Sequence, residues 1–334
     1  MSGQIWAVAS DGGFMYSDQL SDVLRLQVQP AVRMRQFCDA HDVAAEQPGQ
    51  TFGRGDTFRW NVYLDLNTGG DQLDEQKPMP ETGFKVTQAQ LTVVEFGNGV
   101  PYTGKLDNLS KHPVASLIRR NLGNDCAKTL DGAAAFQFRQ TNLKVAPVGG
   151  NSATDVVVVD SGSIGVTNNM ALHAEHVKGI SDAMKERNIP AYQGTDYFAV
   201  GWPKTFRPFK DDLEALFKYT QDGFRQIMMG EIGKYENVRF VEQTNIQKGG
   251  AEDSTTWTFR TSDPWNNAAS DWVFFFGEDT VAEAVIIPEE MRGKIPGDFG
   301  RDRGVAWYYL GGFGIVHSGA ANKNSRIMMW TSAA

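Results

Sequence analysis

Two strand-like runs joined by a long polar connection constrain this chain more than any other feature. The runs lie at residues 57–64 and 84–96, and both are rich in aromatic and β-branched side chains. The connection carries a cluster of charged residues: Asp71, Asp74, Glu75 and Lys77. It is far longer than a tight hairpin turn requires. Because an isolated two-stranded hairpin is at best marginally stable in water, this one must lie on its own chain or on a neighbour.

Apolar residues at three-and-four spacing predict helices on either side of this excursion. Residues 19–40 carry one such face, and Pro30 predicts a kink within it. Residues 107–139 carry another, with Pro113 suited to the first turn. This second helix exceeds the usual globular length and is interpreted as a structural spine. Two shorter helices are predicted further along, at residues 169–187 and 210–220.

Strand-like runs fill most of the remaining chain. They lie at residues 155–160, 192–202, 238–241, 256–260, 272–276, 282–287, 305–316 and 326–330. The elements do not follow the regular βαβ alternation of a doubly wound sheet, and no repeat of twenty to fifty residues is visible. The order therefore predicts an α+β fold.

Composition excludes several classes of protein. The chain has 334 residues and a formal net charge of −8, which excludes a polycation that coats nucleic acid. Cys38 and Cys126 are its two cysteines, so no disulfide framework and no cysteine-based zinc site are expected, and a reducing compartment is the natural interpretation. Without a signal-peptide pattern or an 18-residue apolar stretch, a soluble protein made in a cytoplasm is expected.

The motifs of common enzymes are absent from the sequence. No phosphate-binding glycine loop, Rossmann fingerprint or nucleophile elbow is present. His173 and His176 stand three residues apart on a predicted helix, a spacing that zinc sites use, although no third ligand is apparent. A metal-dependent hydrolase centred on this pair is one alternative, and a solvated helix face is the other. We expect no enzyme, no cofactor and no metal.

Two segments carry a resemblance to a known family. They read IPAYQGTDYFAVGWPKTFRPFKDDL at residues 189–213 and MGEIGKYENVRFVEQTN at residues 229–245. Together with an arm, an acidic-tipped β excursion and a long helix in that order, they resemble the major capsid proteins of tailed bacteriophages, which have the Hong Kong 97 fold. Within that family the chain is most similar to the group typified by the short-tailed phage N-four. The layout covers nearly the whole chain.

The resemblance implies a domain plan and a set of partners. The implied parts are an N-terminal arm (1–48), an extended β-hairpin or E-loop (49–106), a peripheral domain with the spine helix (107–164), an axial domain (165–270) and peripheral strands with the C-terminus (271–334). Copies would form hexamers and pentamers of an icosahedral shell around double-stranded DNA, in a virion assembled in the bacterial host cytoplasm. No scaffolding segment of roughly a hundred residues precedes the arm, so a separate scaffolding protein is expected beside a portal protein and a cement protein. No membrane and no sequence-specific DNA contact are implied.

Assembly by neighbours predicts particular surface residues. The acidic excursion predicts a basic receiving surface, with these candidates: Arg301, Arg303, Lys323 and Arg326. Arg25, Arg33 and Arg35 make the arm locally basic, either as a solvated helix face or as inner-face contacts to DNA phosphates. Some relatives crosslink a loop lysine to a neighbour's asparagine, and Lys77 and Lys85 are candidates by position. Another ring-forming virion protein, such as a tube or baseplate component, remains an alternative.

Overall fold

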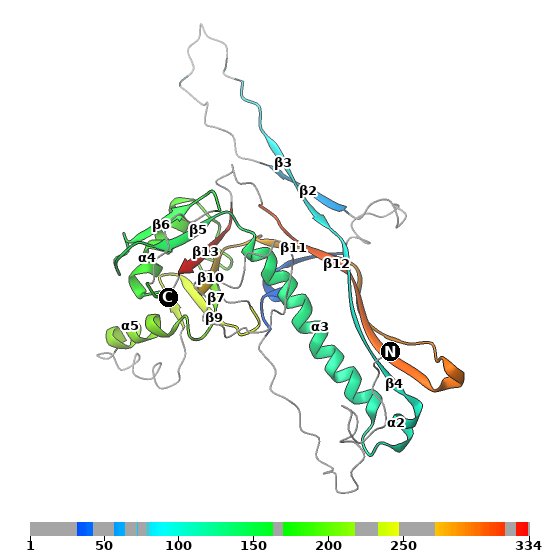
Figure 1. The fold of residues 1–334 in the computed structure, drawn as a ribbon. Helices are drawn as coiled ribbons and strands as arrows, with labels where there is room; N and C mark the ends of the chain where they lie inside the picture. Colours follow the sequence, from blue (N-terminus) through cyan, green and yellow to red (C-terminus); the bar gives the residue numbers. More distant parts are fainter. Residues whose placement is uncertain are drawn as a thin grey trace.

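Two β-sheets and one long helix organise the part of the chain that the structure describes (Figure 1). This computed structural model describes residues 32–42, 57–63, 72, 79, 81–162, 170–217, 233–246, 271–317 and 325–332. Helices and sheets are mixed without a regular βαβ alternation in the described residues, as the sequence predicted, although β7 (Tyr197–Gly201) and β9 (Val238–Glu242) pair in parallel with α5 (Arg207–Phe217) between them.

The first sheet has four strands in the order β1-β11-β12-β4. Its strands are β1 (Asp39–Asp42), β4 (Val94–Thr103), β11 (Val281–Gly293) and β12 (Asp302–Ile315). β1 runs parallel to β11, whereas β11, β12 and β4 pair antiparallel. A separate two-stranded ribbon consists of β2 (Thr57–Tyr63) and β3 (Val86–Thr92), which pair antiparallel along their full length. The hairpin predicted from the sequence is therefore present.

The second sheet has seven strands in the order β6-β5-β13-β10-β7-β9-β8. Their bounds are β5 (Lys144–Pro147), β6 (Val156–Val159), β7 (Tyr197–Gly201), β8 (Lys234–Tyr235), β9 (Val238–Glu242), β10 (Asp271–Phe276) and β13 (Ile327–Ser332). The sheet thus takes strands from three of the expected domains, so boundaries at residues 164 and 271 would cut through it. Pairing between distant strands decides this sheet, and local sequence patterns do not reveal such pairing.

Four α-helices lie among the described residues: α2 (Gly104–Leu109), α3 (Val114–Arg139), α4 (Ala174–Glu186) and α5 (Arg207–Phe217). The spine prediction is confirmed in α3, whose 26 residues extend about 39 Å. Its start differs from the prediction, because Pro113 is the N-cap of α3 and a separate α2 precedes it. Likewise α4 begins later, and α5 earlier, than predicted. No helix in the described part of the chain is both long and apolar enough to cross a membrane.

The helix predicted at residues 19–40 is wrong at its described end. Residues 34–42, which we call the arm root, form a short 3₁₀ turn, η2 (Arg35–Phe37), followed by β1. Met34 and Phe37 are buried, and β1 pairs with β11, so burial and strand pairing override the local helical pattern. Residues 1–31 and 43–48 of the expected arm lie outside the described residues, as does the strand predicted at residues 256–260.

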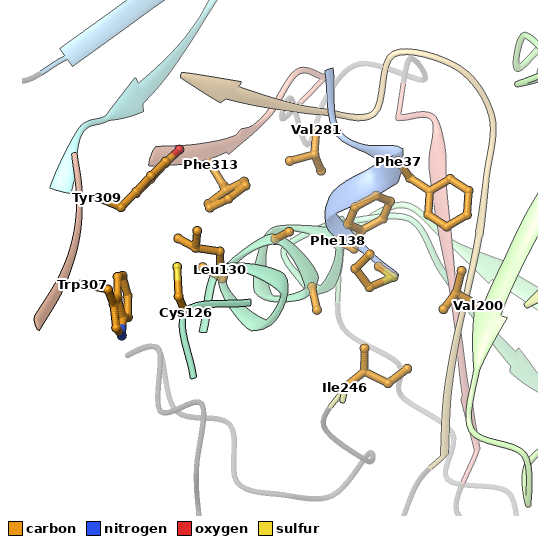
Figure 2. Packing of buried hydrophobic residues seen from close by; sticks show 14 of the residues in the cluster. Phe37, Cys126, Leu130, Phe138, Val200, Ile246, Val281, Trp307, Tyr309 and Phe313 are labelled. Carbon is orange, nitrogen blue, oxygen red and sulfur yellow. The ribbon is translucent and has the colours of Figure 1, made fainter. Parts of the chain in front are cut away.

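The arm root is part of the core between the two sheets. Figure 2 shows Phe37, Phe138 and Val281 gathered in one apolar cluster with residues of the spine helix. The ring of Phe276, from β10, lies 5.0 Å from Phe37 and 5.0 Å from Phe138, measured between centroids. Met34 and Phe37 of the expected arm therefore belong to the core.

Candidate assembly surface

The base of the β2–β3 ribbon is fixed against β12. A Cβ atom on Gly312 would lie 2.6 Å from the carbonyl oxygen of Thr92, so only glycine permits this close approach. Leu91 is buried beside it. Beyond this crossing the ribbon projects from the body of the subunit (Figure 1).

Large apolar side chains are exposed where the ribbon projects. Tyr63 is 70% exposed, Phe84 is 65% exposed, and their ring centroids lie 6.5 Å apart. Val86, next along the same ribbon, is exposed as well. Clustered exposed apolar groups of this kind mark interaction sites on soluble proteins. The ribbon therefore presents a surface that a partner can cover.

A second projecting surface lies where β11 turns into β12. We call residues 291–301 the hairpin tip. Ile295 is 88% exposed and Phe299 is fully exposed. Asp298 and Phe299 have φ angles of 48° and 52°, in the left-handed region that costs a bulky residue about 1–2 kcal/mol. The backbone is thus strained while it holds an aromatic ring in solvent, a combination that favours a binding role.

The charged residues around the hairpin tip are paired within the subunit. The pairs are Arg292 with Glu290, Lys294 with Asp302, Arg301 with Asp298 and Arg303 with Asp107. The Arg301 pair is long, at 3.4 Å, and that guanidinium is largely exposed. Exposed pairs contribute only about 0–1 kcal/mol each, so a neighbour's carboxylate can compete for these arginines.

The predicted receiving surface is not one patch on a single subunit. Arg301 and Arg303 lie at the start of β12, whereas Arg326 lies beyond its end and pairs with Asp279 at 3.3 Å. Arg326 also donates a hydrogen bond to the carbonyl oxygen of Glu278. Fourteen extended residues separate the two ends by about 45 Å. The structure therefore brings together only the first two of these arginines.

The arm root is held by an ion pair that the sequence did not indicate. Arg35 donates through Nε and Nη2 to Glu283, with Nη2 at 2.8 Å, and through Nη1 to Glu289 at 3.1 Å. Buried Glu283 also accepts a 2.8 Å hydrogen bond from the hydroxyl of Tyr309. Hydrogen bonding to Arg35 lowers the pKa of the Glu289 carboxyl. Of the arginines predicted to contact DNA, Arg33 is exposed and Arg35 is engaged with the subunit's own carboxylates.

Several predicted residues lie outside the described part of the chain. They are Arg25, Asp71, Asp74, Glu75, Lys77 and Lys323. Lys85, the other crosslink candidate, is exposed next to β3. The acidic excursion, its receiving surface and the crosslink therefore stay predictions.

The histidine pair caps a helix. The backbone N–H of His173, the N-cap of α4, donates to Nδ1 of His176 at 3.2 Å. The other ring nitrogen of His176 lies 2.8 Å from the carbonyl oxygen of Gly150, and His173 Nδ1 lies 2.8 Å from Asp212. Burial lowers the pKa of His176. Within the described residues no cluster of three or more histidine, cysteine or acidic side chains could hold a metal, so the metal-dependent hydrolase is not supported.

Sequence reasoning missed two residues: one is exposed at the hairpin tip, and the other is buried in the core. Phe299 was not singled out, although the segment PGDFG at residues 296–300 places an aromatic inside a turn-forming cluster. Asp131, on the buried face of α3, was also missed, because carboxylates in a helix ordinarily face solvent. A pattern of flanking turn residues could have indicated the first, whereas no local signal indicates the second.

Known structures resemble this subunit along its whole length. No protein-family model matches the chain, and no curated protein matches its sequence. The capsid of cyanophage P-SCSP1u is 11% identical, with a TM-score of 0.66 over 95% of this chain and 93% of that chain. The capsid of cyanophage Pam1 is 14% identical, with a TM-score of 0.66 over 100% and 99%. The capsid of Ralstonia phage GP4 is 12% identical, with a TM-score of 0.64 over 98% and 98%.

These likenesses establish the fold. With identities of 11% to 14%, they carry no more than that. Each covers at least 93% of both chains, so the likeness is to a whole subunit and not to one shared domain. The chain has the α+β fold of phage capsid subunits, which confirms the expected Hong Kong 97-like fold.

Proposed function

We propose that this chain is a major capsid protein, since it has the fold of phage capsid subunits from end to end. In this proposal its copies associate as hexamers and pentamers into an icosahedral shell that encloses double-stranded DNA. The protein resides in the virion after assembly in the bacterial host cytoplasm, it catalyses no reaction, and it belongs with the capsid proteins of the N-four group. Its proposed partners are further copies of itself, a portal protein, a separate scaffolding protein and a cement protein.

The observation that carries this proposal beyond the fold is the exposure of large apolar side chains on two projecting elements. Tyr63 and Phe84 on the ribbon, and Ile295 and Phe299 on the hairpin tip, are the main ones. Stable protein interfaces bury about 800 Å² on each partner. Two projecting apolar surfaces on one chain suit an assembly of many copies, because each copy can then contact more than one neighbour.

The negative net charge of the chain is consistent with a shell protein that encloses DNA without binding it tightly. At −8 the chain is repelled by DNA at long range, which lets a shell enclose a genome without gripping it. We propose that the acidic excursion meets Arg301 and Arg303 at the start of β12 of a neighbour. Asp74→Lys combined with Glu75→Lys should then impair assembly while the free subunit stays soluble. Normal shells from this double variant would refute that contact, though not the capsid function.

The sheets suggest how the proposed domains divide. The seven-stranded sheet with α4 and α5 corresponds to the axial domain around five- and six-fold axes, so β5, β6, β10 and β13 belong with it. The four-stranded sheet with α3 corresponds to the peripheral domain. Residues 1–48 supply the arm, and residues 49–106 supply the E-loop, of which the ribbon is the described part.

Assembly of the purified chain tests the function directly. Negative-stain microscopy and sedimentation, with and without the phage's scaffolding protein, should show closed shells of uniform diameter. Open tubes would favour a tail component. A stable single molecule at high concentration would refute a shell-forming protein.

Alanine substitutions separate the two projecting surfaces. Phe299→Ala and Phe84→Ala should each lower the yield of shells at least several-fold, because each removes an exposed ring without touching the core. The free subunit should keep its unfolding midpoint in both. Wild-type yield from either variant would remove that element from the assembly surface.

A further inference from the structure

A buried carboxylate joins the arm root, the spine helix and the segment that follows β9. Asp131 lies on the inner face of α3 and is 2% exposed. Its Oδ1 accepts hydrogen bonds from the backbone N–H groups of Met34, at 2.6 Å, and Arg35, at 3.1 Å. Its Oδ2 accepts from the side-chain amides of Gln243 and Asn245, the latter at 3.0 Å. One side chain thus receives four donors from two segments distant from it in sequence.

Burial of this carboxylate has a cost in free energy. All four donors that the described residues supply are uncharged, and the nearby guanidinium of Arg35 is engaged with Glu283 and Glu289. Burial accordingly raises the pKa of Asp131 despite its hydrogen bonds. A buried charge that lacks a cation is costly, and an apolar side chain at such a position is often as stable or more so. Its four hydrogen bonds to two separate segments favour a role in fixing geometry.

The donors show what geometry is fixed. Met34 is the first residue of the arm root, and its N–H donates to the carboxylate. Asn245 ties the same carboxylate to the segment after β9 and also donates to the carbonyl oxygen of Lys128, one helical turn earlier on α3. The arm root is therefore tied at once to the spine helix and to the segment that follows β9.

We propose that Asp131 is a positioning residue for assembly, which fixes the exit direction of the N-terminal arm by holding Met34 and Arg35 against the segment at 243–245. This inference rests on the proposed capsid function. In the proposed assembly the arm would contact a neighbouring copy, so an error in direction at Met34 would displace that contact. Loss of the carboxylate should harm closure of shells more than it harms the fold of one subunit.

The test compares two buried aspartates with different partners. Asp131→Ala removes all four hydrogen bonds of the joint. Asp196→Ala is the matched control, because Asp196 is also buried but pairs with Lys234 and Arg239 inside the seven-stranded sheet, away from the arm. Asp131→Asn is the conservative variant: it keeps an oxygen acceptor, and the buried, unpaired Oε1 of Gln243 can accept from its new N–H group after an amide flip.

Amide hydrogen exchange and shell yield are measured on the same samples. In Asp131→Ala, the amides of Met34 and Arg35 should exchange at least about tenfold faster, as loss of a buried acceptor implies, while α4 stays protected. Shell yield should fall about tenfold or more, and Asp131→Asn should restore most of it. Asp196→Ala should lose at least as much thermal stability yet assemble at wild-type yield below its unfolding midpoint.

The outcomes separate this inference from the function on which it rests. Wild-type shells from Asp131→Ala, with fast exchange at the arm root, would overturn the positioning role and leave the capsid function standing. Equal assembly defects in Asp196→Ala would show that stability alone decides, which also overturns it. Failure of the wild-type chain to assemble refutes both. Should Asp131→Ala not fold, Asn245→Ala replaces it: a several-fold loss of yield is expected, and an unchanged yield overturns the proposal.

Discussion

Replacing Phe37 by alanine tests whether the arm root belongs to the subunit core. Phe37 is 5% exposed, and its ring lies 5.0–5.7 Å from the rings of Phe276, Phe198 and Tyr192. Truncation of a buried phenylalanine costs about 3–5 kcal/mol. Domains are stable by about 5–15 kcal/mol, so Phe37→Ala should remove a large share of the free energy of unfolding.

Urea denaturation, followed by tryptophan fluorescence, measures this loss. With a urea slope of about 3 kcal/mol/M, the midpoint should fall by at least about 1 M. Phe299→Ala is the matched control, because the same atoms are removed from a fully exposed ring, and its unfolding free energy should change by no more than about 0.5 kcal/mol. The two variants should therefore separate stability from assembly.

Two results would refute the reasoning. A loss below about 1 kcal/mol in Phe37→Ala would mean that the ring is not part of a packed core. A separate early transition, with the main unfolding transition unchanged, would mean that residues 34–42 detach without loosening the sheets. Either result would mean that the arm root does not contribute to the stability of the core.

Three further predictions concern the ribbon base and two titrating groups. Gly312→Ala should lower the unfolding free energy by about 1–3 kcal/mol, because its Cβ would meet Thr92 O, whereas Gly83→Ala, with open space around it, should be neutral; urea titration compares them. Burial lowers the pKa of His176, so the unfolded chain binds the proton first and stability should fall as pH drops below about 6.5; His176→Gln should flatten this profile in thermal melts. Hydrogen bonds from Lys234 and Arg239 lower the pKa of Asp196, so this carboxylate stabilises the folded chain above about pH 4, and that stabilisation is lost as pH falls further. Asp196→Asn should therefore be less stable than the wild type at neutral pH, and its stability should change less in acid, as thermal melts measure.

Specific outcomes would contradict each of these predictions. Equal costs at Gly312 and Gly83 would mean that the ribbon does not press on β12. Parallel pH profiles for the wild type and His176→Gln would mean that this imidazole titrates alike in folded and unfolded chains. An unchanged dependence of stability on acid pH in Asp196→Asn would mean that the Asp196 carboxyl has the same pKa in the folded and unfolded chains.

Local sequence patterns predicted the spine helix and the β2–β3 ribbon, because each is determined by residues close together in the chain. The spine helix followed from one apolar face, and its residues Val114, Ile118 and Leu122 are buried as that face required. The β2–β3 ribbon followed from β-rich runs on either side of a polar connection, since such runs pair with each other when they are neighbours in sequence.

Contacts between segments distant in sequence could not be predicted from local patterns. β1 pairs with β11, so that Asp39 lies opposite Ala282, and this pairing ends the helix that periodicity had extended to residue 40. Asp131 is buried only because donors from residues 34–35 and 243–245 converge on it. The β1–β11 pairing and the burial of Asp131 both depend on which distant segments come into contact, and a local sequence pattern does not indicate such contacts.

The long strand β12 links both projecting elements mechanically. Its beginning adjoins the hairpin tip, its Gly312 supports the ribbon, and it is hydrogen-bonded on both flanks, to β11 and to β4. An extended backbone is already near its full length and yields little to tension. In the proposed shell, a force that a neighbour applies to the ribbon would therefore pass along β12 from Gly312 to the hairpin tip, about 33 Å away, and would couple the two contacts of one chain.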